Sequence, residues 1–139
     1  MITLPLQKKE IYNYSPHKGE MLLLDSLDAY SFEEATLCAM VRIAPETMFF
    51  DETKGIVPAW ISFEYMAQSI ALLSGLYASR KGEKPKIGFI MGIREFDIHS
   101  PGFSLGDTVA VNVKQIFRDG DVAVFNGTAR VNDIMITEG

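Results

Sequence analysis

A long, almost wholly apolar stretch, VPAWISFEYMAQSIALLSGL, runs from Val57 to Leu76. It predicts one helix that begins near Pro58, where a missing backbone N–H costs nothing, and ends near Gly82. Apolar side chains fall on every side of this helix, so the rest of the chain is expected to cover most of its surface. The fold must therefore be built around a single central helix.

Extended runs flank the helix on both sides. Before it, MLLLDSLDAY and ATLCAMVRI (residues 21–30 and 35–43) read as two strands joined by a tight turn. Three further runs follow the helix, at residues 86–100, 107–117 and 121–136. The last two are joined by a turn that contains Asp119-Gly120, a strong hairpin signal. This order predicts an α+β fold in which a curved antiparallel sheet wraps around the helix and leaves a free edge for a second subunit.

Size and composition exclude several classes of protein. A length of 139 residues suits one domain over residues 1–139, and a net charge of −5 gives no support to nucleic-acid binding. The single cysteine, Cys38, can build neither a disulfide nor a thiolate metal site, and we expect no metal and no cofactor. No signal peptide and no membrane span of ~20 apolar residues is present, so we expect a soluble cytoplasmic protein. The sequence stops within or just beyond its last predicted strand, which leaves open a continuation past Gly139.

One carboxylate interrupts the apolar helix. Glu64 lies in the second turn and Gln68 one turn further on, so their side chains share a helix face and can form a hydrogen bond. A carboxylate in apolar surroundings is suited to acid–base chemistry, although an exposed strip or a subunit contact is the alternative. The N–H groups of Ala59 and Trp60, at the helix start, could polarise a carbonyl oxygen. Together these groups indicate a thioester or ester site.

Three motifs resemble those of the FabZ-type 3-hydroxyacyl-carrier-protein dehydratases. SPHKGEMLLLD (residues 15–25) resembles L-P-H-R-x-P-x-L-L-x-D, and VPAWISFEYMAQ (residues 57–68) resembles x-P-G-V-L-x-x-E-A-M-A-Q. IMGIREFDIHSPGFSLGD (residues 90–107) is similar to the strand and turn that follow in that family. The resemblance, in order and spacing, implies the hot-dog fold, a long helix wrapped by an antiparallel sheet. It also implies that the protein removes water from a 3-hydroxyacyl thioester of acyl carrier protein to give the trans-2-enoyl thioester.

The resemblance also assigns roles to residues. It places the family's catalytic carboxylate at Glu64 and the backbone N–H that binds the thioester oxygen at Ala59. The family's catalytic His lies fourteen residues before the Glu, a position that Phe50 holds here. Phenylalanine transfers no proton, so a site made by this chain alone lacks its base. His17, expected to be structural, and His99, expected at a surface or interface, both stay open as substitute bases.

The helix start PAW-x-x-x-EYMAQ is most similar to the ApeP-like dehydratases of aryl-polyene gene clusters. Such clusters contain a second hot-dog subunit, ApeI-like, whose pattern keeps the catalytic His. The resemblance thus implies a dehydratase subunit of fatty-acid or polyene biosynthesis in a heterodimer whose partner supplies a His opposite Glu64; a homodimer is the alternative. Two other functions stay open: an acyl-thioesterase in which Glu64 promotes attack by water, and a non-catalytic dimer partner.

Two further groups of residues are candidates for substrate contacts. Cations just past the helix would dock the acidic carrier protein, or would only complement the helix dipole. These cations are Arg80, Lys81, Lys84, Lys86 and Arg94. Large apolar side chains would line a tunnel for the acyl chain between helix and sheet, or would be plain core. The tunnel candidates are Phe49, Phe50, Trp60, Phe89 and Met91.

Overall fold

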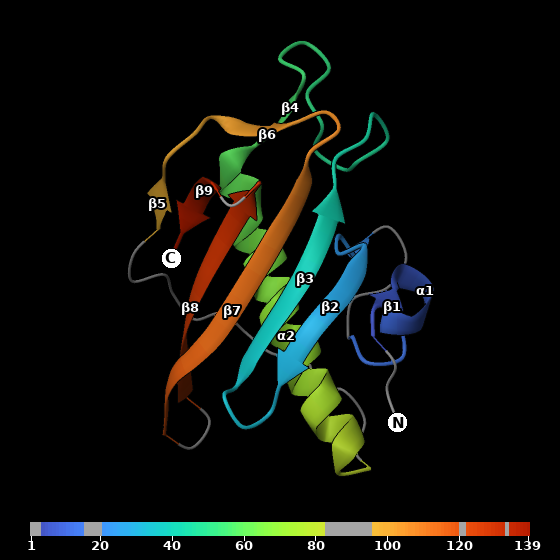
Figure 1. The fold of residues 1–139 in the computed structure, drawn as a ribbon, viewed down its shortest axis with the longest axis vertical. Coiled ribbons are helices and arrows are strands. Elements are labelled where there is room, and N and C mark those ends of the chain that lie inside the picture. The colour runs from blue at the N-terminus through green and yellow to red at the C-terminus, as the bar shows by residue number, and fades with distance from the viewer. Residues whose placement is uncertain (1–3, 16–20, 83–95, 120–121, 133) are drawn as a thin grey trace.

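The computed structural model describes residues 4–15, 21–82, 96–119, 122–132 and 134–139. The strands are β1 (Leu6–Gln7), β2 (Ser26–Ser31), β3 (Thr36–Arg42), β4 (Ile56–Pro58), β5 (Asp97–Ile98), β6 (Gly102–Ser104), β7 (Thr108–Asp119), β8 (Val122–Val131) and β9 (Ile134–Glu138). The helices are α1 (Lys8–Ile11), the short 3₁₀ helix η2 (Ala59–Ile61) and α2 (Ser62–Arg80). Within the described residues, seven strands form one antiparallel sheet in the order β1-β2-β3-β7-β8-β9-β5 (Figure 1). β4 and β6 form a separate pair.

The central strands show the alternation that the sequence predicts. β3 pairs antiparallel with β7 along its whole length, and the β7–β8 pairing runs to Asp119 opposite Val122, which confirms the predicted hairpin. Alternate side chains of β3 and β7 point toward the helix and are buried, as expected for a sheet covered on one face. These inward residues are Leu37, Ala39, Val41, Val109, Val111 and Val113.

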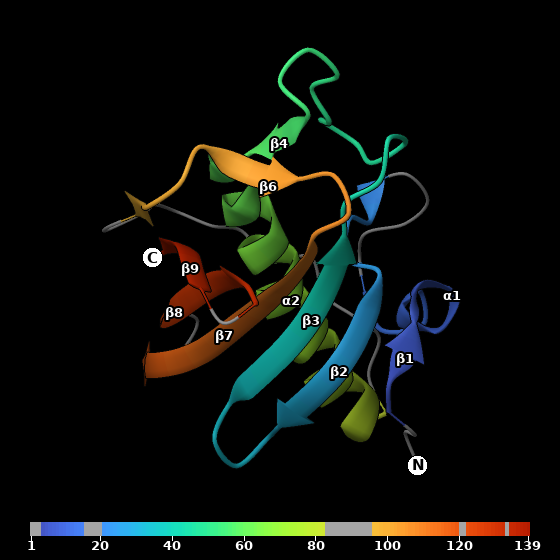
Figure 2. The same cartoon turned by 45° about the horizontal axis from the view of Figure 1, so that its top comes forward.

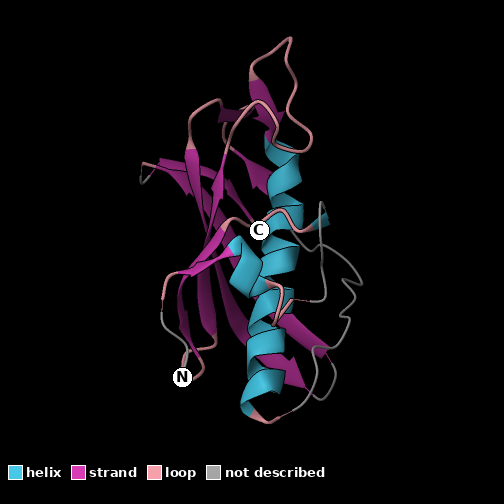
Figure 3. Ribbon diagram, turned by 90° about the vertical axis from the view of Figure 1, so that its right-hand side faces the viewer, coloured by secondary structure: helices cyan, strands magenta, loops and turns pink. Residues whose placement is uncertain are grey.

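The long helix α2 lies along the inner face of this sheet, as predicted (Figure 3). It has 19 residues, about 28 Å, and it starts later than predicted because Val57 and Pro58 pair with β6 instead. Gly82 follows the helix end with a φ of 77°, the left-handed conformation that glycine adopts readily. The prediction of the helix end at this residue is therefore confirmed.

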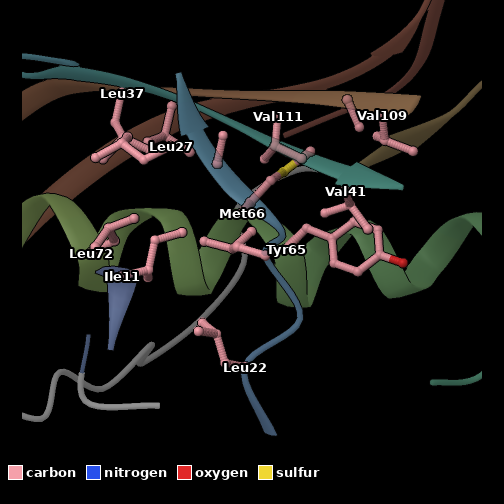
Figure 4. Close-up of a cluster of buried hydrophobic side chains, with 14 of the residues drawn as sticks. Ile11, Leu22, Leu27, Leu37, Val41, Tyr65, Met66, Leu72, Val109 and Val111 are labelled. Atoms are coloured by element: carbon pink, nitrogen blue, oxygen red, sulfur yellow. The ribbon is translucent and has the colours of Figure 1, made fainter. Parts of the chain in front are cut away.

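Apolar side chains of α2 and the sheet meet in one core (Figure 4). Tyr65, Met66 and Leu72 of the helix contribute to this core. At Gly75 the helix lies so close to the backbone of Tyr14 that a Cβ would fall on the Tyr14 carbonyl oxygen. The N-terminal segment thus packs against the helix, and this packing requires a glycine at that position.

The helix is less completely covered than the sequence predicts. Trp60, just before α2, is 61% exposed, and Phe63 and Ile70 are only partly buried. An all-round apolar pattern predicts burial on most sides, but the described part of the chain covers chiefly the face toward the sheet. Exposed aromatic and aliphatic groups on a helix are typical of a surface that a second subunit covers.

Two of the predicted extended runs differ in the structure. Residues 121–136 were expected as one run but form β8 and β9, because the chain reverses at Asn132, which has a φ of 51°. Of the run predicted at 86–100, residues 86–95 lie outside the described residues, and residues 97–98 form β5 at the sheet edge. In the described part of the chain, no helix has the length and apolar character needed to cross a membrane.

Candidate active site

A cavity of about 330 Å³ opens beside the start of α2 and contains the carboxylate that the sequence singles out. Two of its lining residues, Trp60 and Ile61, belong to η2, which directly follows β4. Figure 2 shows β4 paired with β6 at one end of the fold. The cavity walls are mostly apolar, and among the described lining residues Glu64 alone is ionisable. The lining residues are Met21, Leu23, Met48, Phe49, Trp60, Ile61, Phe63, Glu64 and Gln68.

A second hollow, of about 400 Å³, lies over strands β2, β3, β7 and β8. It is larger, but none of its lining residues carries a carboxylate or an imidazole. Cys38, which lines it, is partly buried, and burial followed by the charge of Asp28 raises the pKa of its thiol. A raised pKa keeps this thiol protonated and weakly nucleophilic, so the smaller cavity is the better candidate for chemistry.

Through its side-chain amide, Gln68 forms hydrogen bonds that join two parts of the cavity wall. Its side chain is 1% exposed, its Oε1 accepts the Leu23 N–H at 2.8 Å, and its Nε2 donates to the Met21 carbonyl at 2.7 Å. The same nitrogen donates to Glu64 Oε1 at 3.3 Å, so the predicted pair is present. The amide therefore fixes residues 21–23 against the helix and gives Glu64 one long hydrogen bond.

Glu64 itself is only partly buried. Gln68 contacts one carboxylate oxygen, and the other has no hydrogen-bond partner among the residues that the structure describes. A carboxylate beside an apolar wall, held at one oxygen, can exchange a proton with a ligand in the cavity.

Ala59 is not placed as the sequence analysis expects. Its N–H, predicted to bind a thioester oxygen, donates at 2.9 Å to the carbonyl of Pro101, because β4 and β6 bring the two backbones together. The next N–H, that of Trp60, has no hydrogen-bond partner among the described residues. Of the two donors that the sequence analysis names at the helix start, Ala59 and Trp60, the Trp60 N–H is thus the one left available among the described residues.

No imidazole lines the cavity within the described part of the chain. Phe50, at the position of the expected His, packs against the core, whereas its neighbour Phe49 lines the cavity. His99 lies outside the lining residues, and its Nε2 is 2.9 Å from Glu138 Oε2. His17 lies outside the described residues.

Comparison with known proteins gives the family. Residues 9–139 match the family described as ApeP-like: ApeP dehydratase. The chain belongs to the ApeP-like dehydratase family. Among proteins of curated function, none matches the sequence.

Solved structures agree with this ApeP-like assignment in their fold. One chain of the dehydratase heterocomplex ApeI:P from Xenorhabdus doucetiae is similar to this chain with a TM-score of 0.85 and 23% identity, over 99% of this chain and 88% of that one. The smu.793 protein of Streptococcus mutans, bound to acetyl CoA, has a TM-score of 0.59 and 16% identity, over 88% of this chain and 90% of that one. The E. coli PaaI protein of the phenylacetic acid degradation operon has a TM-score of 0.55 and 12% sequence identity, over 81% of this chain and 77% of that one. The predicted hot-dog fold is confirmed.

The ApeP-like chain brings together only part of the predicted substrate contacts. Of the tunnel candidates, Phe49 and Trp60 line the cavity, and Phe50 packs against the core. Phe89 and Met91 lie outside the described residues. Sequence reasoning missed Met21 and Leu23, because the contact of residues 21–23 with the helix joins positions 45 or more residues apart. It also did not name Met48, Ile61 and Phe63 as lining residues. The motif at residues 15–25 was the signal that marked this segment.

Two of the predicted docking cations, Arg80 and Lys81, are described, and neither lines the cavity. Arg80 follows Glu64 by sixteen helical positions, about 24 Å along the axis. Its guanidinium lies 5.1 Å from the ring centre of Phe32, and Lys81 Nζ lies 5.7 Å from that of Tyr77. Lys84, Lys86 and Arg94 lie outside the described residues.

Proposed function

We propose that this ApeP-like chain is the carboxylate-bearing subunit of a 3-hydroxyacyl-[acyl-carrier-protein] dehydratase whose catalytic base comes from a partner subunit. The observation that carries the proposal is a cavity with Glu64 in its wall and, within the described residues, no imidazole beside it. Phe50, at the position where the resemblance expects the base, packs against the core. The similarity to a chain of a dehydratase heterocomplex supports the presence of a partner subunit.

The proposed reaction needs one base and one acid. A His of the partner subunit removes the proton from the α-carbon of the 3-hydroxyacyl thioester, and the electron pair of that bond forms the Cα=Cβ double bond. The Cβ–O bond breaks, and Glu64 donates a proton to the departing hydroxyl, which leaves as water. The proton on the His returns to Glu64 through solvent before the next turnover. Each such group is typically worth ~10²–10⁴ in rate, so a chain without the base should be nearly inactive.

The remaining parts of the site fit this chemistry. Phe49, Trp60 and Phe63 give the cavity an aromatic wall that suits an apolar acyl group. Phe49 and Trp60 are also 52% and 61% exposed, which suits a wall that a partner subunit completes. Docking of the carrier protein at Arg80 and Lys81 stays a prediction, and it requires the thioester arm to span the ~24 Å to Glu64.

The decisive experiment compares the purified chain alone with the chain plus a His-bearing hot-dog subunit. The substrate is a 3-hydroxyacyl carrier protein, and the product is measured as the enoyl thioester. We expect no dehydration by either subunit alone and full activity from the mixture. Dehydration by this chain alone would overturn the proposal and would make His17 and His99 the next residues to mutate. Hydrolysis of acyl-CoA by the chain alone would support the thioesterase instead.

A further inference from the structure

Two buried hydroxyl groups lie behind the start of the helix, outside the cavity. Ser62 Oγ is 2.6 Å from Thr137 Oγ1 and 2.7 Å from the carbonyl oxygen of Ala59, and both side chains are fully buried. A carbonyl only accepts, so the Ser62 proton goes to Ala59. The Thr137 hydroxyl must then donate to Ser62. The result is a directed chain from Thr137 through Ser62 to the Ala59 carbonyl.

These hydrogen bonds end on the Ala59–Trp60 peptide group, whose other end is the Trp60 N–H. A peptide group is planar, so the Ala59 carbonyl and the Trp60 N–H point in opposite directions. The carbonyl also accepts the Ser62 N–H, which fixes its orientation further. The Trp60 N–H points away from the buried hydroxyl groups, has no partner among the described residues, and belongs to a residue that lines the cavity.

Hydrogen bonds to a carbonyl oxygen polarise the whole amide and strengthen its N–H as a donor, by about 10–30% per bond. A donor whose direction is fixed before the substrate arrives stabilises developing negative charge without reorganisation. We infer that Thr137 and Ser62 are positioning residues, which orient and polarise the Ala59–Trp60 peptide so that the Trp60 N–H binds the thioester carbonyl oxygen. This inference rests on the proposed function and names the donor that it needs.

A purely structural role is the alternative, in which the pair only ties β9 to the helix start. Valine has nearly the shape of threonine but no hydroxyl, whereas serine keeps the hydroxyl and loses a methyl group. Thr137→Val and Thr137→Ser therefore separate the two roles. If only packing matters, Thr137→Ser is the worse variant; if polarisation matters, Thr137→Val is.

Nuclear magnetic resonance can observe the donor directly, because the chain has one tryptophan. Protein labelled with ¹⁵N-tryptophan gives a single backbone amide signal, that of Trp60. We expect Thr137→Val to move this amide proton upfield in the unliganded complex, with Thr137→Ser close to wild type. Addition of an amide-linked enoyl-pantetheine, which has the carbonyl but no hydroxyl to expel, should move the signal downfield, and least in Thr137→Val.

Kinetics supply the second readout. In the mixed complex we expect Thr137→Val to lower kcat about tenfold with KM nearly unchanged, and Thr137→Ser to restore kcat. If Thr137→Val does not fold, Ser62→Ala removes the same hydrogen bonds, and the same amide shift and kcat are measured for it. A Trp60 amide proton that is identical in wild type and in the hydroxyl-deleted variant overturns the inference. That comparison needs no turnover, so it holds even if the complex proves inactive and the proposed function fails.

Discussion

Gln68 donates a hydrogen bond of 3.3 Å to Glu64, the longest of the three that its amide makes. The two shorter bonds bind the backbone of residues 21–23, which forms one wall of the cavity. Gln68 thus acts chiefly on the shape of the site, and Glu64 remains the group free to exchange a proton.

Replacing Gln68 by methionine should destabilise the fold. The substitution keeps the volume but leaves the Leu23 N–H and the Met21 carbonyl without their partner, and an unsatisfied buried group costs about 1–3 kcal/mol. We expect the free energy of unfolding in urea to fall by about 2 kcal/mol or more. Glu64→Gln, measured beside it, should change that free energy by less than about 0.5 kcal/mol. Equal effects of the two substitutions would contradict the assigned roles.

Two glycines should differ sharply when alanine replaces them. A Cβ at Gly75 meets the backbone carbonyl of Tyr14, whereas a Cβ at Gly127 meets the side chain of Met66, with Sδ nearest at 2.7 Å. A methionine can rotate away and a packed backbone cannot. We expect Gly75→Ala to cost more than about 3 kcal/mol and Gly127→Ala about 1–2 kcal/mol. Thermal unfolding of both variants tests this order, and the reverse order would contradict the close packing at Tyr14.

Tyr65 should be replaceable by phenylalanine with a gain in stability. Its ring is in the core, and its hydroxyl is buried with no hydrogen-bond partner among the described residues. Removing an unsatisfied hydroxyl should raise the free energy of unfolding by about 1 kcal/mol at neutral pH. A loss of stability in Tyr65→Phe would show that the hydroxyl has a partner.

The same tyrosine predicts a pH dependence. Burial, followed by the charge of Asp25, raises the pKa of its hydroxyl above the usual value near 10. Above about pH 10 the unfolded chain therefore loses this proton while the folded chain keeps it, and stability falls as the pH rises. Below that pH the hydroxyl is protonated in both the folded and the unfolded chain, so it adds no pH dependence to stability. Wild type should lose stability faster than Tyr65→Phe between about pH 10 and 11.5, and parallel curves would contradict the assignment.

Phe49 should show opposite effects on stability and on activity. It has a φ of 70°, which costs a residue other than glycine about 1 kcal/mol or more, and the residue is 52% exposed. Phe49→Gly should leave the free energy of unfolding unchanged or raise it by about 1 kcal/mol, while KM of the mixed complex rises several-fold. Phe50→Ala is the matched control and should destabilise, because its partly buried ring packs against the core. A Phe49→Gly complex with unchanged KM would remove this residue from the acyl site.

The parts of the fold that the sequence predicted are those set by local pattern. Alternation along residues 107–117 predicted β7, and the four-residue spacing predicted the contact between Glu64 and Gln68. The parts that it missed depend on partners far along the chain. Val57 is not part of the helix, because it pairs with β6. The Ala59 N–H donates to the carbonyl of Pro101, more than forty residues away. No periodicity in a single segment carries that information.

The central claim is that Glu64 is one half of a site shared with a partner subunit. The most direct measurement is kcat of the mixed complex on a 3-hydroxyacyl carrier protein, with Glu64→Gln in this chain and the exposed Glu33→Gln as a matched control. We predict that kcat falls by ~10²–10⁴ for Glu64→Gln and stays at the wild-type value for Glu33→Gln, with both complexes intact. A Glu64→Gln complex as active as wild type would contradict the claim.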